Sequence, residues 1–150
     1  MPKAKTTLTD ADYERLAQFR YGLRRFLHWS EQQARAAGVT PTQHQLLLAI
    51  RASRTPGGAT VGEVADVLII RHHSAVELID RTEKKGLISR ERDSDQQSVV
   101  HLQLTELGAL TLSSLSGVHL RELAQLAPTI QALLGSLDDS DDVEDLLLKR

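Results

Sequence analysis

Four consecutive residues in the middle of the chain carry side chains suited to reading a nucleic acid. They are Arg71, His72, His73 and Ser74. An arginine can donate two hydrogen bonds to one guanine, a serine hydroxyl can bond a phosphate or a base edge, and a neutral histidine can donate or accept. The alternative is an exposed polar helix end that has no partner. His73 has the angle closest to the core face of its helix.

Further candidates for contact with DNA follow this run. Arg81 belongs to the same predicted helix, but Glu77, Asp80 and Glu83 stand close to it, so an ion pair within the chain is an equal alternative. The remaining candidates are two strand arginines and two turn glutamines, Arg90, Arg92, Gln96 and Gln97. The arginines share a strand face by alternation and are expected to bind phosphate. The glutamines can bond backbone or minor-groove acceptors without adding charge.

Two short helices are predicted to position these side chains. Thr60 and Glu63 predict a capping box that opens the first of them. Its expected buried residues are Val64, Val67 and Leu68. The second helix is predicted over about 72–85, and Gly86 suits its left-handed cap. Its expected buried face consists of Ala75, Leu78, Ile79 and Thr82.

A β-hairpin is predicted after the second helix. Residues 87–90 and 99–104 read as two antiparallel strands, and the polar residues 93–98 read as the turn between them. Two helices joined by a tight link and followed by such a hairpin form a winged helix-turn-helix. Modules of this kind mostly bind duplex DNA, with the second helix in the major groove and the hairpin beside it.

A long helix is predicted before this module. Its apolar stripe covers about 9–37, and Gly38 ends it. The capping box Thr40-Pro41-Thr42-Gln43 opens the next helix. A single small domain seldom needs so long a first helix, so the stripe favours a partner chain, although burial within the chain explains it nearly as well.

After the hairpin, Thr105 predicts the cap of another long helix, and Pro128 is expected to start a separate helix to about Leu137. Residues 138–142 read as an acidic break, and 143–148 as a last short helix. The predicted fold class is therefore mainly α with a small β-hairpin wing. We expect one domain over 1–150, with the winged helix-turn-helix at about 40–104 and dimerisation helices at about 9–37 and 105–149.

Composition excludes several classes of function. The chain has 150 residues and no cysteine, which removes disulfides, thiol redox sensing and cysteine-ligated zinc. His72 and His73 are a poor metal site, because neighbouring helix residues point about 100° apart. No catalytic triad or phosphate-binding glycine loop is visible, so neither an enzyme nor a cofactor is expected. With no signal peptide or membrane span in the sequence, a cytoplasmic location is expected.

Charge gives no general signature of DNA binding. The net charge is −2, and within 60–101 eight acidic residues outnumber six lysines and arginines. Phosphate binding depends on which charges share a face rather than on their sum, so this balance is a caution and not an exclusion.

A small-molecule pocket is predicted near the junction of the first two helices. Its candidate residues are Arg25, His28, Trp29 and His44. One aromatic ring with a few polar groups is the usual composition of such pockets. Packing of Trp29 in a dimer interface is the favoured alternative.

Over roughly residues 9–137 the chain resembles the MarR (multiple antibiotic resistance regulator) family of bacterial repressors. The resemblance lies in the order and spacing of four phrases, TPTQHQLLLAI, TVGEVADVL, LIDRTEKKGLISRERD and VVHLQLTELG. It implies a homodimer built from the terminal helices, with two winged modules on a pseudo-palindromic operator. It also implies repression of nearby genes and release from DNA by a small, often aromatic, ligand.

The chain departs from the family pattern at the DNA-facing positions. Where the family commonly has an aspartate and one or two arginines at the wing turn, this chain has Gln96, Gln97 and Ser98. Glu77 stands where an arginine is frequent. These departures keep a second hypothesis open, in which the winged scaffold is a protein-interaction module with weak or lost DNA binding. The first hypothesis is a dimeric, ligand-responsive repressor.

Overall fold

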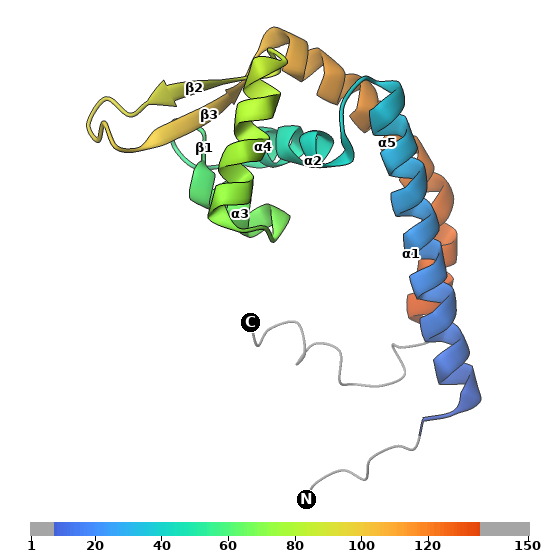
Figure 1. Cartoon of the computed structure of the whole chain (residues 1–150). Helices are drawn as coiled ribbons and strands as arrows, with labels where there is room; N and C mark the ends of the chain where they lie inside the picture. Colours follow the sequence, from blue (N-terminus) through green and yellow to red (C-terminus); the bar gives the residue numbers. More distant parts are fainter. Residues whose placement is uncertain (1–7, 136–150) are drawn as a thin grey trace, which may run out of the picture. The chain divides into compact units, whose positions relative to one another are not determined.

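A computed structural model describes residues 8–135 of the chain (Figure 1). In chain order its elements are α1 (Asp10–Ala36), α2 (Pro41–Ala52), β1 (Ala59–Thr60), α3 (Val61–Leu68), α4 (His72–Lys84), β2 (Ile88–Arg92), β3 (Val100–Leu104) and α5 (Glu106–Gly135). The fold is mainly helical with a small antiparallel sheet, as predicted. The expected acidic break at 138–142 and the short helix at 143–148 lie outside the described residues.

The chain divides into two compact units. Ser30–Val118 form one unit, which contains α2, α3, α4, the three strands and the adjoining ends of the two long helices. We call it the winged unit. In the other, which we call the helical unit, α1 up to Trp29 lies with α5 from His119 onward. The single domain expected over 1–150 stays a prediction.

The hydrophobic core lies in the winged unit. Its fully buried large side chains are Leu46 and Leu47 of α2, Val64 of α3, Ile79 and Thr82 of α4, Ile88 of β2 and Leu102 of β3. Thr82 is the polar member, and its hydroxyl donates to the carbonyl of Leu78 at 2.7 Å. The predicted inner face of α4 is thus confirmed, and its burial directs the opposite face of the helix to solvent.

Caps predicted from the sequence determine where several helices start. Thr40 and Gln43 form the reciprocal capping box of α2. Gly38, at φ 81°, ends α1 in a conformation that glycine adopts without strain. The Thr105 hydroxyl accepts from the Gly108 amide at 3.1 Å and donates to the Gly86 carbonyl at 2.6 Å. It therefore caps α5 and ties it to the end of α4.

The sheet contains a strand that the sequence did not reveal. Its order is β1-β3-β2, and β1 pairs with β3 through Ala59 opposite Leu102 and Thr60 opposite His101. A strand of only two residues next to Gly57-Gly58 has no period to detect. It matters because it joins the loop before α3 to the base of the wing.

Three other expectations were wrong. Pro128 does not start a helix, since α5 runs through it to Gly135. The fixed φ of proline fits either place, and the preceding Leu-Ala-Gln-Leu-Ala run favours continuing the helix. Val67 is 60% exposed, and Ala65 takes its place in the core. At the start of α3, Thr60 accepts from the Glu63 amide as predicted, but the Glu63 carboxylate bonds the α2–β1 loop instead.

Candidate nucleic-acid interface

The start of α4 presents a cluster of polar side chains that form no ion pair or side-chain hydrogen bond with the other residues of 8–135. Arg71 is the N-cap residue, with extended backbone and no side-chain capping bond. Arg71, His72 and His73 are exposed, and Ser74 is half-buried. His73 therefore lies on the solvent side of α4, although its angle around the helix axis is the one closest to the core face. Together with the free amides of the first helical turn, these groups can bond phosphate oxygens or base edges.

Farther along α4 the exposed face carries both signs of charge. Glu77 and Arg81 are exposed, as is Lys84. Among residues 8–135 no ion pair involves Arg81. Arg81 does not pair with Asp80 or Glu83, because both of those carboxylates bind another arginine.

That other arginine is Arg90 of β2. Its guanidinium donates to Asp80 and Glu83 of α4, so it ties the wing to the helix. Burial lowers the pKa of Arg90, but its bonds to Asp80 and Glu83 outweigh burial and hold that pKa above its usual value. The expectation that Arg90 and Arg92 act alike needs correction, since Arg90 already has two anionic partners and Arg92 has none among the described residues.

The wing turn is held by short-range hydrogen bonds. The Arg92 guanidinium donates to the Gln97 carbonyl at 2.9 Å. One carboxylate oxygen of Asp93 accepts from the amides of Asp95 and Gln96 at 2.8 and 3.0 Å. These bonds shape the turn while the side chains of Gln96 and Gln97 stay exposed. The wing therefore offers amide groups and one exposed guanidinium to a partner.

A histidine that sequence reasoning passed over lies at the base of this turn. His101 of β3 bonds the Gly58 carbonyl through Nδ1 at 2.9 Å and Asp93 through Nε2 at 3.0 Å. The Gly58 carbonyl and the Asp93 carboxylate hold the pKa of His101 above its usual value. The pKa of Asp93 is lowered, first by its bond with His101 and then by its bonds from two backbone amides. The sequence did contain a signal for this bond. His101 points to the other face of the strand from Leu102, and its spacing from Asp93 is typical of neighbours across a hairpin.

A second overlooked group supports the loop before β1. The Glu63 carboxylate accepts from the hydroxyls of Ser53 and Thr55 at 3.0 and 2.8 Å. Burial raises the pKa of Glu63, but the bonds from Thr55 and Ser53 outweigh it, so its pKa is lowered. Arg54, in the same loop, is exposed and adds a cation that the sequence pattern did not single out.

The acidic excess between residues 60 and 101 is smaller at the surface than in the sequence. Four of the eight acids have partners within the winged unit, namely Glu63, Asp80, Glu83 and Asp93. Four others are exposed, namely Asp66, Glu77, Glu91 and Asp95. The exposed cations of the same segment are Arg71, Arg81, Lys84, Lys85 and Arg92, of which Lys85 also donates to the Gly38 carbonyl. The local balance is thus close to even, with the cations at the start and outer face of α4 and on the wing.

The structure divides the predicted small-molecule pocket. Arg25, His28 and Trp29 belong to the helical unit, whereas His44 is a buried residue of α2 in the winged unit. Trp29 packs on Phe26 and His119, with ring centroids 5.9 and 4.9 Å away. Arg25 and Trp29 do line a cavity of about 490 Å³ in the helical unit, but His28 is not part of its lining. The four-residue pocket stays a prediction.

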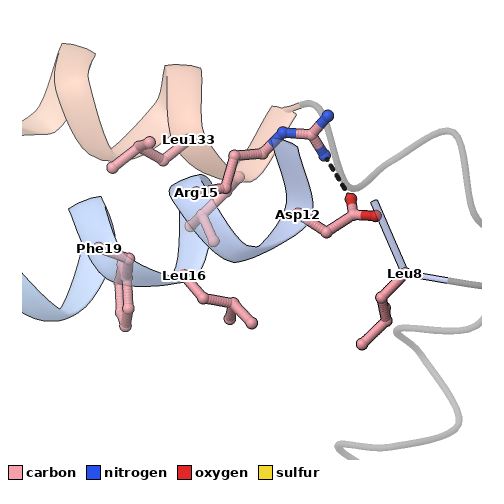
Figure 2. Close-up of a pocket in the computed structure, with 7 residues that line it drawn as sticks. Leu8, Asp12, Arg15, Leu16, Phe19 and Leu133 are labelled. Atoms are coloured by element: carbon pink, nitrogen blue, oxygen red, sulfur yellow. Dashed lines mark hydrogen bonds and ion pairs between the residues drawn. The ribbon is translucent and has the colours of Figure 1, made fainter. Parts of the chain in front are cut away.

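The helical unit also contains an apolar groove that faces solvent. Leu8, Leu16 and Phe19 line it with Leu133 and Leu134, around a cavity of about 350 Å³. Figure 2 shows Leu16 and Phe19 on α1, Leu133 on α5 and Leu8 just before α1, with the Arg15–Asp12 ion pair between Leu16 and Leu8. Leu16 is 57% exposed and Leu134 48%.

Comparison with known proteins identifies the winged part of the chain. Residues 37–97 match a family model described as the MarR family. This segment covers α2, both helices of the helix-turn-helix and most of the wing. The winged-helix part of the chain is therefore similar to the MarR family. No match was found among curated proteins.

Solved MarR-family structures share the fold along most of the chain. A MarR family protein from Bacillus stearothermophilus has a TM-score of 0.70 at 21% identity, covering 89% of this chain and 97% of that one. AbsC from Streptomyces coelicolor, a MarR family transcriptional regulator, scores 0.68 at 17%, covering 90% and 97%. The MepR–DNA complex of S. aureus scores 0.59 at 20%, covering 81% and 96%.

Two further properties hold for residues 8–135. No group of three or more histidine, aspartate or glutamate side chains is placed to hold a metal ion. No helix in the same range is both long and apolar enough to cross a membrane.

Proposed function

We propose that this protein is a sequence-specific DNA-binding transcription regulator. The observation that carries the proposal is the exposed start of α4, where Arg71, His72 and His73 form no ion pair or side-chain hydrogen bond within residues 8–135, together with a wing that presents Arg92 and two glutamines. The MarR-family match supports it, as does the MepR structure, in which a protein of the same fold is bound to DNA. Arg71 and the histidines would contact base edges, and Arg81, Arg92, Gln96 and Gln97 the backbone or minor groove.

We further propose that the protein acts as a homodimer through its helical unit. Seven large apolar side chains between Leu8 and Leu27 are at least 40% exposed, as are Leu120, Leu123 and Leu134 on α5. A second copy is the occupant that fits, because both helices bring apolar surface and a symmetric partner would cover both. Leu16→Asp is expected to shift the mass in solution from dimer to monomer, and an unchanged dimer would contradict this assignment.

The helical unit also bears on how DNA binding would be regulated. We propose repression of nearby genes that ends when a small aromatic compound binds the helical unit. The cavity lined by Tyr21, Arg25 and Trp29 also contains Glu122, so it combines aromatic rings with one charge of each sign, which suits a small aromatic compound that carries polar groups. A protein with this role acts in the cytoplasm, on its own operator DNA. Loss of salicylate-induced release in Arg25→Ala, with normal DNA affinity, is the expected result.

Direct binding measurements test the proposal. Fluorescence anisotropy with DNA from upstream of the protein's own gene is expected to give a Kd of roughly 10⁻⁸ M at moderate salt. Arg71→Ala should weaken binding by about 1–3 kcal/mol and relax specificity. Arg35→Ala, which removes an exposed arginine of α1 paired with Glu31, is the matched control and should bind as the wild type does. Equal binding to random DNA favours the interaction-module hypothesis instead.

A further inference from the structure

His101 occupies an enclosed position between two segments that are far apart in the sequence. The residue is 7% exposed, and its ring touches the loop before β1 on one side and the wing turn on the other. A Cβ at Gly57 would lie 3.2 Å from the ring, so this loop is shaped closely around the imidazole. His101 therefore links a fixed part of the winged unit to the wing.

Both hydrogen-bond partners of the ring are acceptors. Nδ1 faces the Gly58 carbonyl at 2.9 Å, and Nε2 faces the Asp93 carboxylate at 3.0 Å. A neutral imidazole has one N–H and can satisfy only one of them, whereas the imidazolium satisfies both. The charged groups that face the ring are Asp93 and, from the paired strand β2, Glu91, and both favour the proton. The loop before β1 adds the dipole of the Gly58 carbonyl.

Asp93 passes this interaction on to the tip of the wing. Its Oδ2 bonds His101, while its Oδ1 accepts from the amides of Asp95 and Gln96. The carboxylate is thus held at both oxygens, and a continuous series of bonds runs from Gly58 to Gln96. If the ring loses a proton, one acceptor faces a lone pair, and the carboxylate loses either its anchor or its charged partner.

We propose that His101 is a positioning residue whose proton holds the wing turn in its DNA-contacting shape, so that DNA affinity falls as the imidazole deprotonates. This inference rests on the proposed function, because the wing is assigned there to DNA. His101 itself touches no base or phosphate. It acts through Asp93 on the backbone that carries Gln96 and Gln97.

The direction of the pH effect follows from the two titrations. The pKa of His101 is raised, so its contribution is present at low pH and is lost as the pH rises through that raised value. The pKa of Asp93 is lowered, so its contribution is present above its usual range and is lost only in strong acid. The clamp is complete between the two pKa values, so its upper limit lies above the usual histidine range.

NMR on the full chain without DNA tests the clamp itself. The His101 ring signal, identified by its absence in His101→Gln, should titrate above the usual histidine range and move to lower pH in Asp93→Asn. The amide shifts of Asp95 and Gln96 should change with the same midpoint as the ring in the wild type. A ring that titrates in the ordinary range, or amides that ignore it, would overturn the proposal.

DNA affinity measured at constant ionic strength tests the consequence. Between about pH 5.5 and pH 8.5 the wild type should lose up to about tenfold in affinity per pH unit for each linked proton. His101→Gln should remove that component, and Asp93→Asn should shift it to lower pH. His72 and His73 are present in all three proteins, so their titration is a shared background. Identical pH profiles would overturn the role of His101 alone. A titrating clamp in a protein that binds no DNA would overturn the proposed function and the coupling together.

Discussion

Replacing Arg90 or Arg92 by methionine should separate two roles that look alike in the sequence. Arg90 is 30% exposed at its side chain and bonds Asp80 and Glu83, which are 48% and 38% exposed. Pairs this accessible to water contribute about 0.2–1 kcal/mol each, so Arg90→Met should lower the free energy of unfolding by about 1 kcal/mol and at most about 2 kcal/mol. Arg92 bonds only a carbonyl and is exposed, so Arg92→Met should change stability by less than about 0.5 kcal/mol.

DNA binding should respond in the opposite order. Arg92→Met should reduce the salt dependence of log Kd by about one unit for each protomer bound, because one phosphate contact is lost. Arg90→Met should leave that slope unchanged. Urea denaturation gives the stability, and anisotropy over a series of salt concentrations gives the slope. In an Asp80→Asn, Glu83→Gln background the stability cost of Arg90→Met should vanish. A reduced slope with unaltered stability for Arg90→Met would refute the assignment of Arg90 to the fold.

Other substitutions give equally direct outcomes. Gly108→Ala would place a Cβ 1.9 Å from a backbone carbonyl oxygen and should destabilise the fold by about 3 kcal/mol, whereas Gly62→Ala has open space and should be neutral or slightly stabilising in the same urea titration. Ile69 is 91% exposed and has φ 55°, a backbone conformation that asparagine adopts more readily, so Ile69→Asn should stabilise the fold by about 1 kcal/mol. Val67→Asn is the helical control. If Ile69→Asn loses as much stability as Val67→Asn, the backbone at Ile69 is not strained. Glu77→Gln removes an exposed negative charge from the outer face of α4 and should tighten DNA binding several-fold, and unchanged affinity would place α4 away from phosphate.

The sequence predicted the elements whose signals are local. Thr40 with Gln43, Thr105 and Gly38 marked helix ends correctly, because a cap is a contact between residues three or four positions apart. The inner face of α4 was also predictable, since Ala75, Leu78, Ile79 and Thr82 repeat with helical spacing. These signals were enough for the winged helix-turn-helix.

The features that failed depend on contacts between distant residues. β1 is too short to have a period and exists because β3 pairs with it across forty residues of chain. Asp80 and Glu83 pair with Arg90 and not with Arg81, because β2 packs against α4. His101 looked like an ordinary strand residue until Gly58 and Asp93 were brought to its two nitrogens. Of these pairings, only that of Asp93 with His101 has a signal in the sequence, namely hairpin spacing, whereas the pairings of β1 and of Arg90 have none.

Selection of bound DNA from a random pool tests the central claim most directly. The full chain is incubated with random duplexes at moderate salt, and bound sequences are recovered over several rounds alongside Arg71→Ala. We expect the wild type to enrich a pseudo-palindrome whose half-sites lie about 10 base pairs apart, and Arg71→Ala to lose definition at some positions of it. A pool that stays random, or one enriched identically by both proteins, would contradict the account.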